Sequence, residues 1–230
     1  MRSADDVIAF EGQFDPADAQ PWGHYGLDHV DTAANRALAE DAALQGFVLL
    51  KNERATLPFK AGKGSLAVLG PHANAISAML GNYHEKVEPK GVMVTPCKGI
   101  AAANVQPATT AAGSSASPTE SGANVTTVCS VPDGCTVAGN ATCFDGATGA
   151  AVAAASAVVL VIGIDGSQEA EGHDRTEITL PGTQEALVAA AAKSANGKPV
   201  VVVVLSGSAV DLSSLKDDDR IGAIVWVGRN

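Results

Sequence analysis

The sequence contains the apolar run Val158-Val-Leu-Val-Ile162, which is followed directly by Gly163. A second run of this kind, Val200-Val-Val-Val-Val-Leu205, lies further along the chain. Neither run alternates apolar with polar residues, as a strand with one solvent-facing side would. Continuous Val, Ile and Leu residues indicate strands that are buried on both faces, and such strands are typical of a parallel sheet covered by helices. The two runs therefore predict an α/β fold.

The sequence on either side of these runs predicts more elements of the same fold. Shorter apolar runs predict three further strands, which we also expect to be buried, at residues 47–50, 66–69 and 223–227. Helical spacing, capping residues and alanine richness predict helices at residues 34–46, 147–157, 183–194 and 212–216. We expect a three-layer sandwich with a mostly parallel sheet. Its chemistry should lie in the loops beyond the carboxyl ends of the strands.

Composition and charge exclude two classes of partner. The 230 residues include 25 acidic and 15 basic side chains, for a net charge of −10, and the basic residues form no cluster. Nucleic acids and anionic membrane surfaces are bound by positive potential, so we expect neither as a partner. The longest apolar run is also far shorter than the roughly 20 residues that a membrane-spanning helix needs.

Four cysteines, Cys97, Cys129, Cys135 and Cys143, point to disulfides. Their spacing lacks the short Cys-x2-Cys pair of a zinc site, so we expect no metal, and three disulfide connectivities are open. Two glycosylation motifs, at Asn124 and Asn140, lie in the same region. Together they predict a secreted protein. The N-terminus has no apolar signal-peptide core, so we expect the signal peptide to lie outside this sequence.

The loop after Gly163 is rich in chemistry-bearing side chains. It carries Asp165, Glu169, Glu171, His173, Asp174, Arg175 and Glu177 within thirteen residues. Its carboxylates would repel a pyrophosphate, it lacks the glycine fingerprint of a dinucleotide site, and it has no nucleophile-elbow serine. It also lacks the ligand register of a calcium loop. General acid/base chemistry by a carboxyl group fits the loop, and so does a charged surface turn with a local Asp174–Arg175 pair.

The chain also carries a series of blocks in a fixed order. These are Gln45-Gly-Phe-Val-Leu-Leu-Lys-Asn52, Leu66-Ala-Val-Leu-Gly-Pro-His-Ala-Asn74, Gly81-Asn-Tyr83, Glu169-Ala-Glu-Gly-His-Asp-Arg175, Leu180-Pro-Gly-Thr-Gln184 and Ile224-Val-Trp-Val-Gly228. Together they closely resemble the second domain of glycoside hydrolase family 3, in the branch of plant and fungal β-xylosidases and α-L-arabinofuranosidases. The resemblance implies a six-stranded α/β sandwich, incomplete here at its C-terminus. It also implies a preceding barrel domain, absent from this sequence, as partner.

The resemblance further implies a mechanism and a set of site residues. The family's enzymes are retaining exo-glycosidases without a cofactor, in which the barrel carries an Asp nucleophile and the sandwich lends an acid/base Glu. The Glu-Gly-x-Asp-Arg match assigns that role to Glu171, with Glu169 as the runner-up. Asp174 and Arg175 would support the loop or contact substrate. Asn82 and Tyr83 would touch the sugar or pack the loop.

Two functions follow from this organisation. We expect residues 1–30 to be the linker from the barrel, residues 31–230 to be the sandwich, and residues 101–146 to be a low-complexity, cysteine-containing surface insertion within it. In the first function the chain is part of a secreted enzyme that hydrolyses terminal β-xylosyl, arabinosyl or glucosyl residues of plant cell-wall oligosaccharides. In the second it is a non-catalytic domain that binds carbohydrate or a partner protein.

Overall fold

The computed structural model describes residues 16, 19–21, 23–80, 93–105, 126–132, 135–139 and 143–228. The chain divides into two compact units, residues 1–46 and residues 47–230. The first unit contains the short helix η2 (Leu27–His29) and helix α2 (Ala33–Gly46). Thr32 caps α2, because its Oγ1 accepts a hydrogen bond of 3.1 Å from the backbone N–H of Asn35. This helix was predicted from the sequence.

The second unit is built around a sheet of six strands in the described residues, in the order β1-β6-β5-β4-β2-β3. The strands are β1 (Val48–Asn52), β2 (Leu66–Leu69), β3 (Thr127–Ser130), β4 (Ala157–Gly163), β5 (Val200–Leu205) and β6 (Ala223–Trp226). Every pairing is parallel except that of β1 with β6. The mostly parallel sheet expected from the sequence is confirmed.

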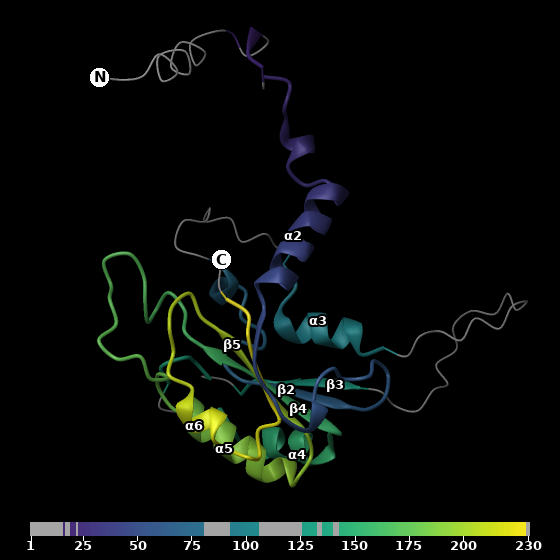
Figure 1. Ribbon diagram of the computed structural model, residues 1–230, viewed down its shortest axis with the longest axis vertical. Coiled ribbons are helices and arrows are strands. Elements are labelled where there is room, and N and C mark those ends of the chain that lie inside the picture. The colour runs from purple at the N-terminus through teal and green to yellow at the C-terminus, as the bar shows by residue number, and fades with distance from the viewer. Residues whose placement is uncertain are drawn as a thin grey trace, which may run out of the picture. The chain divides into compact units, whose positions relative to one another are not determined.

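Helices cover both faces of this sheet. Figure 1 shows α4 (Gly146–Ala154), α5 (Gln184–Ala195) and α6 (Ser213–Lys216) on one face and α3 (Pro96–Ala103) on the other. Two further short helices, η3 (Glu53–Ala55) and η4 (Ser77–Met79), lie in connections. The three layers expected from the sequence are therefore present.

The central strand β4 is buried along its whole length. Val158, Leu160 and Ile162 belong to the larger apolar core, which includes side chains of α4 and α5. Val159 and Val161 point to the opposite face, into a smaller core that includes Cys97 of α3. Because side chains alternate between the two faces of a strand, a run without polar residues is required when both faces are covered.

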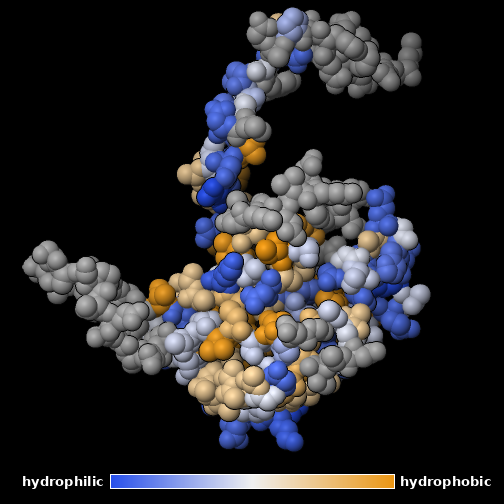
Figure 2. Space-filling model, turned by 180° about the vertical axis from the view of Figure 1, so that it is seen from behind, coloured by the Kyte–Doolittle hydropathy of each residue, from blue (hydrophilic) through white to orange (hydrophobic). Residues whose placement is uncertain are grey.

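Strand β1 differs from expectation, because it is not buried. Among the described strands it pairs only with β6, and Val48, Leu49 and Leu50, together with the preceding Phe47, are 45–55% exposed. Lys51 is the buried residue of this strand, and its Nζ donates to the carbonyls of Lys216 and Asp218. An apolar run cannot distinguish an edge strand from a central one. Figure 2 shows apolar residues beside polar ones on one face of the molecule.

Two regular elements occur where the sequence predicts no helix or strand: α3 overlaps the start of the expected insertion at residues 101–146, and β3 lies within it. Helix α3 has a capping residue, Thr95, and a proline at its first position, a start signal that the sequence-based prediction overlooked. Strand β3 extends the sheet beside β2. Asn104, at the C-terminal end of α3, is buried, and its carboxamide hydrogen bonds to Gly62, Gly64 and Thr127.

The four cysteines form two disulfides, so the expectation of disulfides is confirmed and one of the three connectivities is selected. Cys97 of α3 is joined to Cys129 of β3 across a Cα–Cα distance of 6.1 Å. Cys135 is joined to Cys143, eight residues later, across 4.8 Å. Among the described residues, none of the helices is both long and apolar enough to cross a membrane.

The packing predicts which leucines contribute most to the free energy of unfolding. Leu160→Ala, in the middle of the buried strand, should lower the free energy of unfolding of the 230-residue chain by about 2–5 kcal/mol, because it leaves a cavity between two packed layers. Leu49→Ala on the exposed edge strand is the control and should change it by less than about 0.5 kcal/mol. Urea unfolding followed by circular dichroism measures both. Equal effects of the two substitutions would contradict this account of the core.

Candidate functional site

The loops that leave β4 and β5 lie side by side at the carboxyl edge of the sheet. Gly163 ends β4 opposite Leu205, which ends β5. Gly163 has a φ of +137°, and a Cβ atom there would collide with the backbone oxygen of Leu205, so only glycine permits this close exit. Further along, the N–H of Asp211 donates to the carbonyl of Ile178 at 2.7 Å. The two loops are therefore joined at both ends.

Glu169 joins the two loops at their centre. Its Oε2 accepts a hydrogen bond of 2.5 Å from the hydroxyl of Ser208, which follows β5. The same oxygen lies 3.6 Å from Nε of Arg175. The Nη2 of Arg175 in turn donates to the carbonyl of Ala209 at 2.9 Å. The contacts of Glu169 with Ser208 and Arg175 thus hold the loop after β4 onto the loop after β5.

Glu171 lies at the tip of a tight turn. Ala170 and His173 exchange two backbone hydrogen bonds, of 3.1 and 2.9 Å, which close a four-residue turn around Glu171 and Gly172. Gly172, at the third position, has a φ of +74°, which is the conformation that a type II turn requires there. The side chain of Glu171 is exposed and forms no hydrogen bond or ion pair with any described residue. The turn presents this carboxyl group to the outside.

The remaining charged residues of the loop have separate roles. Asp165 accepts hydrogen bonds from the backbone N–H and the hydroxyl of Ser167, so it stabilises a local turn. Within the described residues, Asp174 has no ionic partner, and Arg175 turns instead to Glu169. The local Asp174–Arg175 pair considered from the sequence is therefore not formed. His173 is exposed and contributes its backbone to the turn.

Several residues that support this part of the structure were not predicted as site residues. The buried hydroxyl of Ser206 accepts a hydrogen bond of 2.8 Å from Nε1 of Trp226 on β6. Ser208 binds Glu169, and the carboxamide of the buried Gln184 hydrogen bonds to both backbone groups of Gly163. Ser206 and Ser208 could have been suspected, because they directly follow a strand at the carboxyl edge of a parallel sheet.

A short acidic turn supports the far end of the loop after β5. Oδ1 of Asp211 accepts a hydrogen bond of 2.9 Å from the N–H of Ser213, the first residue of α6. The hydroxyl of Ser213, and then its N–H, hold the pKa of the Asp211 carboxyl below its usual value, because both stabilise the ionised form. This contact fixes the residue whose own N–H binds Ile178.

Four predicted site residues lie outside the described residues: Asn82, Tyr83, Asn124 and Asn140. Within the part of the chain that the structure describes, His, Cys, Asp and Glu side chains form no group of three that could hold a metal ion. The candidate site therefore consists of the Glu171 turn and the polar contacts beneath it. Chemically, it offers the exposed carboxyl group of Glu171, at the tip of a turn on a loop that is anchored at its base.

The anchoring contacts predict how the turn moves. Arg175→Met should speed hydrogen exchange of the hydrogen-bonded amides of Ala170, His173 and Asp211 by about 10- to 150-fold, because a hydrogen bond to a charged group contributes about 1.5–3 kcal/mol. Arg54→Met is the matched control. Arg54 also donates to a single backbone carbonyl, that of Asp219, but lies away from this loop. Unchanged exchange in Arg175→Met, or equal changes in both variants, would contradict the anchoring role.

Comparison with known proteins identifies relatives of this chain. Residues 47–230 match the family model of the glycosyl hydrolase family 3 C-terminal domain. Beta-D-xylosidase 3 of Arabidopsis thaliana is 42% identical over 217 residues, which are 91% of this chain and 24% of that protein. Beta-xylosidase/alpha-L-arabinofuranosidase 2 of Medicago sativa subsp. varia is 41% identical over 221 residues, or 95% of this chain and 24% of that protein.

A solved structure agrees with these sequence matches. A GH3 exo-beta-xylosidase in complex with a xylobiose aziridine activity-based probe aligns with a TM-score of 0.76 and 31% identity. The alignment covers 96% of this chain and 25% of that one, so the chain spans about a quarter of the length of its relatives. The family expected from the ordered sequence blocks is confirmed. The chain belongs to glycosyl hydrolase family 3, and residues 47–230 are its C-terminal domain.

Proposed function

We propose that this chain supplies the acid/base carboxyl group of a retaining exo-glycosidase. The observation that carries the proposal is the placement of Glu171 at the exposed tip of a turn whose base is anchored between two strand ends. The nucleophile would come from a barrel domain, to which residues 1–30 would be the linker. The substrate would be an oligosaccharide of the plant cell wall with a terminal β-xylosyl residue, or with an arabinosyl or glucosyl one.

The contacts of the two glutamates support Glu171 over Glu169 for this role. A general acid must reach the leaving oxygen of a substrate and exchange a proton with it. Glu169 is bound to Ser208 and lies beside Arg175, whose side chain is only 11% exposed. Glu171 has none of these contacts and faces outward. We therefore assign Glu169 to holding the loop and Glu171 to proton transfer.

The proposed reaction is that of a retaining glycosidase, which uses two carboxyl groups on either side of the glycosidic bond. In the first step the barrel aspartate attacks the anomeric carbon, while Glu171 gives its proton to the leaving oxygen as the glycosidic bond breaks. In the second step the Glu171 carboxylate takes a proton from water, and that water displaces the aspartate from the sugar. Asp174 would lie at the edge of this site, and Arg175 would keep Glu169 in place.

We further propose that the protein works in the secretory pathway or outside the cell. Both disulfides of the domain support an oxidising compartment, because such bonds are rare in reducing cytosol. The printed names of the relatives, which include xylosidases from a plant and from Aspergillus, support the choice of a β-xylosyl substrate. Asn124 and Asn140 remain predicted glycosylation sites.

The test uses the complete protein, in which this chain acts with its barrel. Glu171→Gln should lower kcat/KM for xylobiose by about 10²–10⁴-fold, because the poor leaving group needs a proton from the general acid. An activated aryl xyloside, which needs no proton, should lose far less. Azide, which attacks without a general base, should restore turnover of the aryl substrate as xylosyl azide.

Glu169→Gln is the control for this assignment. It keeps the shape of the side chain and removes the charge beside Arg175, so it should affect both substrates equally. The assignment is wrong if Glu171→Gln affects both substrates equally, or if Glu169→Gln alone shows the dependence on the leaving group. Unchanged activity in both variants would point to a non-catalytic domain.

A further inference from the structure

The motif Leu180-Pro-Gly-Thr-Gln184 has no part in the function proposed above, yet its last residue is almost completely buried. Gln184 is 2% exposed at the start of α5. Its Oε1 accepts a hydrogen bond of 2.8 Å from the N–H of Gly163. Its Nε2 lies 2.8 Å from the carbonyl oxygen of the same residue. One side chain thus binds both backbone groups of the residue from which the Glu171 loop departs.

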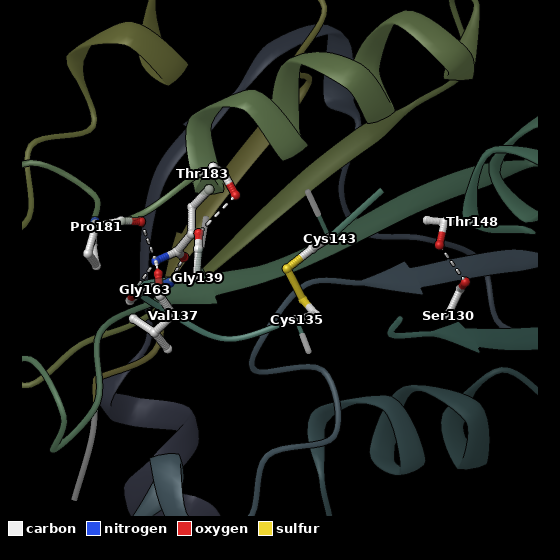
Figure 3. The surroundings of a disulfide bond; sticks show 10 residues. Ser130, Cys135, Val137, Gly139, Cys143, Thr148, Gly163, Pro181 and Thr183 are labelled. Atoms are coloured by element: carbon white, nitrogen blue, oxygen red, sulfur yellow. Dashed lines mark hydrogen bonds between the residues drawn. A yellow bond between two sulfur atoms is a disulfide. The ribbon is translucent and has the colours of Figure 1, made fainter. Parts of the chain in front are cut away.

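The same carboxamide reaches a second loop. Nε2 of Gln184 also donates to the carbonyl of Val137, at 3.1 Å, and to that of Pro181, at 3.2 Å. Val137 is buried and lies between Cys135 and Cys143, which close the loop of residues 135–143 with a disulfide. Figure 3 shows Val137, Gly139, Gly163, Pro181 and Thr183 close together, beside this disulfide.

The neighbouring residue strengthens this connection. The hydroxyl of Thr183 donates to the carbonyl of Gly139 at 3.3 Å, so two successive residues at the start of α5 hold the disulfide-closed loop. Cys143 is itself buried in the larger core, with Cys135 packed against it. Within the described residues, the disulfide-closed loop is therefore held both to the start of α5 and to the larger core.

The hydrogen bonds between Gln184 and Gly163 lie at the start of the loop that carries Glu171. Gly163 begins the loop, and the buried Ile164 donates its N–H to the carbonyl of Leu205; the next side chain that anchors the loop is Glu169, just before the Glu171 turn. A displacement at Gly163 would therefore be carried to the turn. A carboxamide suits the position, because it is an uncharged group that both donates and accepts hydrogen bonds.

We propose that Gln184 is a positioning residue for Glu171, and that it couples the acid/base loop to the loop closed by Cys135 and Cys143. This inference rests on the proposed function, because it takes Glu171 as the proton donor. Its structural part, the coupling of the two loops, does not depend on that assignment. The region of the disulfide thereby becomes part of the support of the active site.

The test removes the carboxamide without changing the size of the side chain. In the complete protein, Gln184→Met should lower kcat/KM for xylobiose about 10- to 100-fold more than for an activated aryl xyloside, since displacement of a catalytic group by about 1 Å costs up to 10²-fold. In the 230-residue chain, hydrogen exchange at Ile164 and His173 should become faster. Loss of stability alone would reduce the active fraction for both substrates equally.

The matched control is Asn104→Leu. Asn104 is also a buried carboxamide with three hydrogen-bond partners, but it holds α3 to the opposite end of the sheet. It should lower the unfolding midpoint without changing the ratio of the two kcat/KM values or the exchange of the Glu171 loop. The double variant Cys135→Ser/Cys143→Ser retains Gln184 but opens its support. It should change the ratio of the two kcat/KM values and the hydrogen exchange of the Glu171 loop in the same direction as Gln184→Met, by a smaller factor.

The inference is overturned if Gln184→Met and the double cysteine variant match Asn104→Leu in both readouts. If Gln184→Met does not fold, the double variant decides by the same criteria. Failure of the proposed function is recognised separately, since Glu171→Gln would then show no dependence on the leaving group. In that case the exchange rates in the 230-residue chain decide whether Gln184 couples the two loops.

Discussion

The parallel pairing of β4 with β5, covered by side-chain layers on both faces, is the constraint on which the rest of this domain depends. Six residue pairs run in register from Val158 and Val200 to Gly163 and Leu205. Because the strands are parallel, they end at the same level, and their following loops leave the sheet together. The apolar residues that make this pairing stable thus also determine where the polar residues meet.

At that edge the polar side chains divide into two kinds. Glu169, Arg175 and Ser208 are engaged with one another or with backbone carbonyls, and a separate hydrogen bond joins Ser206 to Trp226 of β6. Glu171 stands apart from this network, on a turn that the network supports. A carboxyl group held by other side chains is well suited to fixing a loop, whereas proton transfer to a substrate requires one that is free to approach it. The arrangement also explains why two carboxylates occur so close together in the sequence.

In the proposed enzyme, the barrel domain would complete the active site around Glu171. An exposed carboxyl group becomes an effective general acid when substrate and neighbouring protein exclude water around it. The chain spans about a quarter of the length of its relatives, and three apolar residues of its edge strand β1, together with Phe47 just before it, are exposed. In the proposed enzyme, the barrel would cover the Glu171 turn and provide the nucleophile and most contacts to the sugar.

Much of the fold could be predicted from the sequence, because continuous apolar runs identified β1, β2, β4, β5 and β6 and their order along the chain. Strand β3 was missed, because Thr127–Ser130 is short and its neighbours are biased in composition. The exposure of β1 could not be predicted, since it depends on the position of the strand in the sheet.

The candidate site was predicted less completely than the fold. The charged loop could be located, because it follows a buried strand. The division of roles between Glu169 and Glu171 required the contact with Ser208, which is distant in the sequence. The disulfide pairing and the contacts of Gln184 are likewise long-range, so no local pattern could have indicated them.

The most direct test of the central claim is a crystal structure of the complete protein with a covalently bound xylosyl probe. It measures the separation between the carboxyl carbon of Glu171 and that of the nucleophilic aspartate. Our account predicts about 5–5.5 Å, the separation typical of retaining glycosidases. A separation of about 6.5 Å or more, or a closer approach by Glu169, would contradict it.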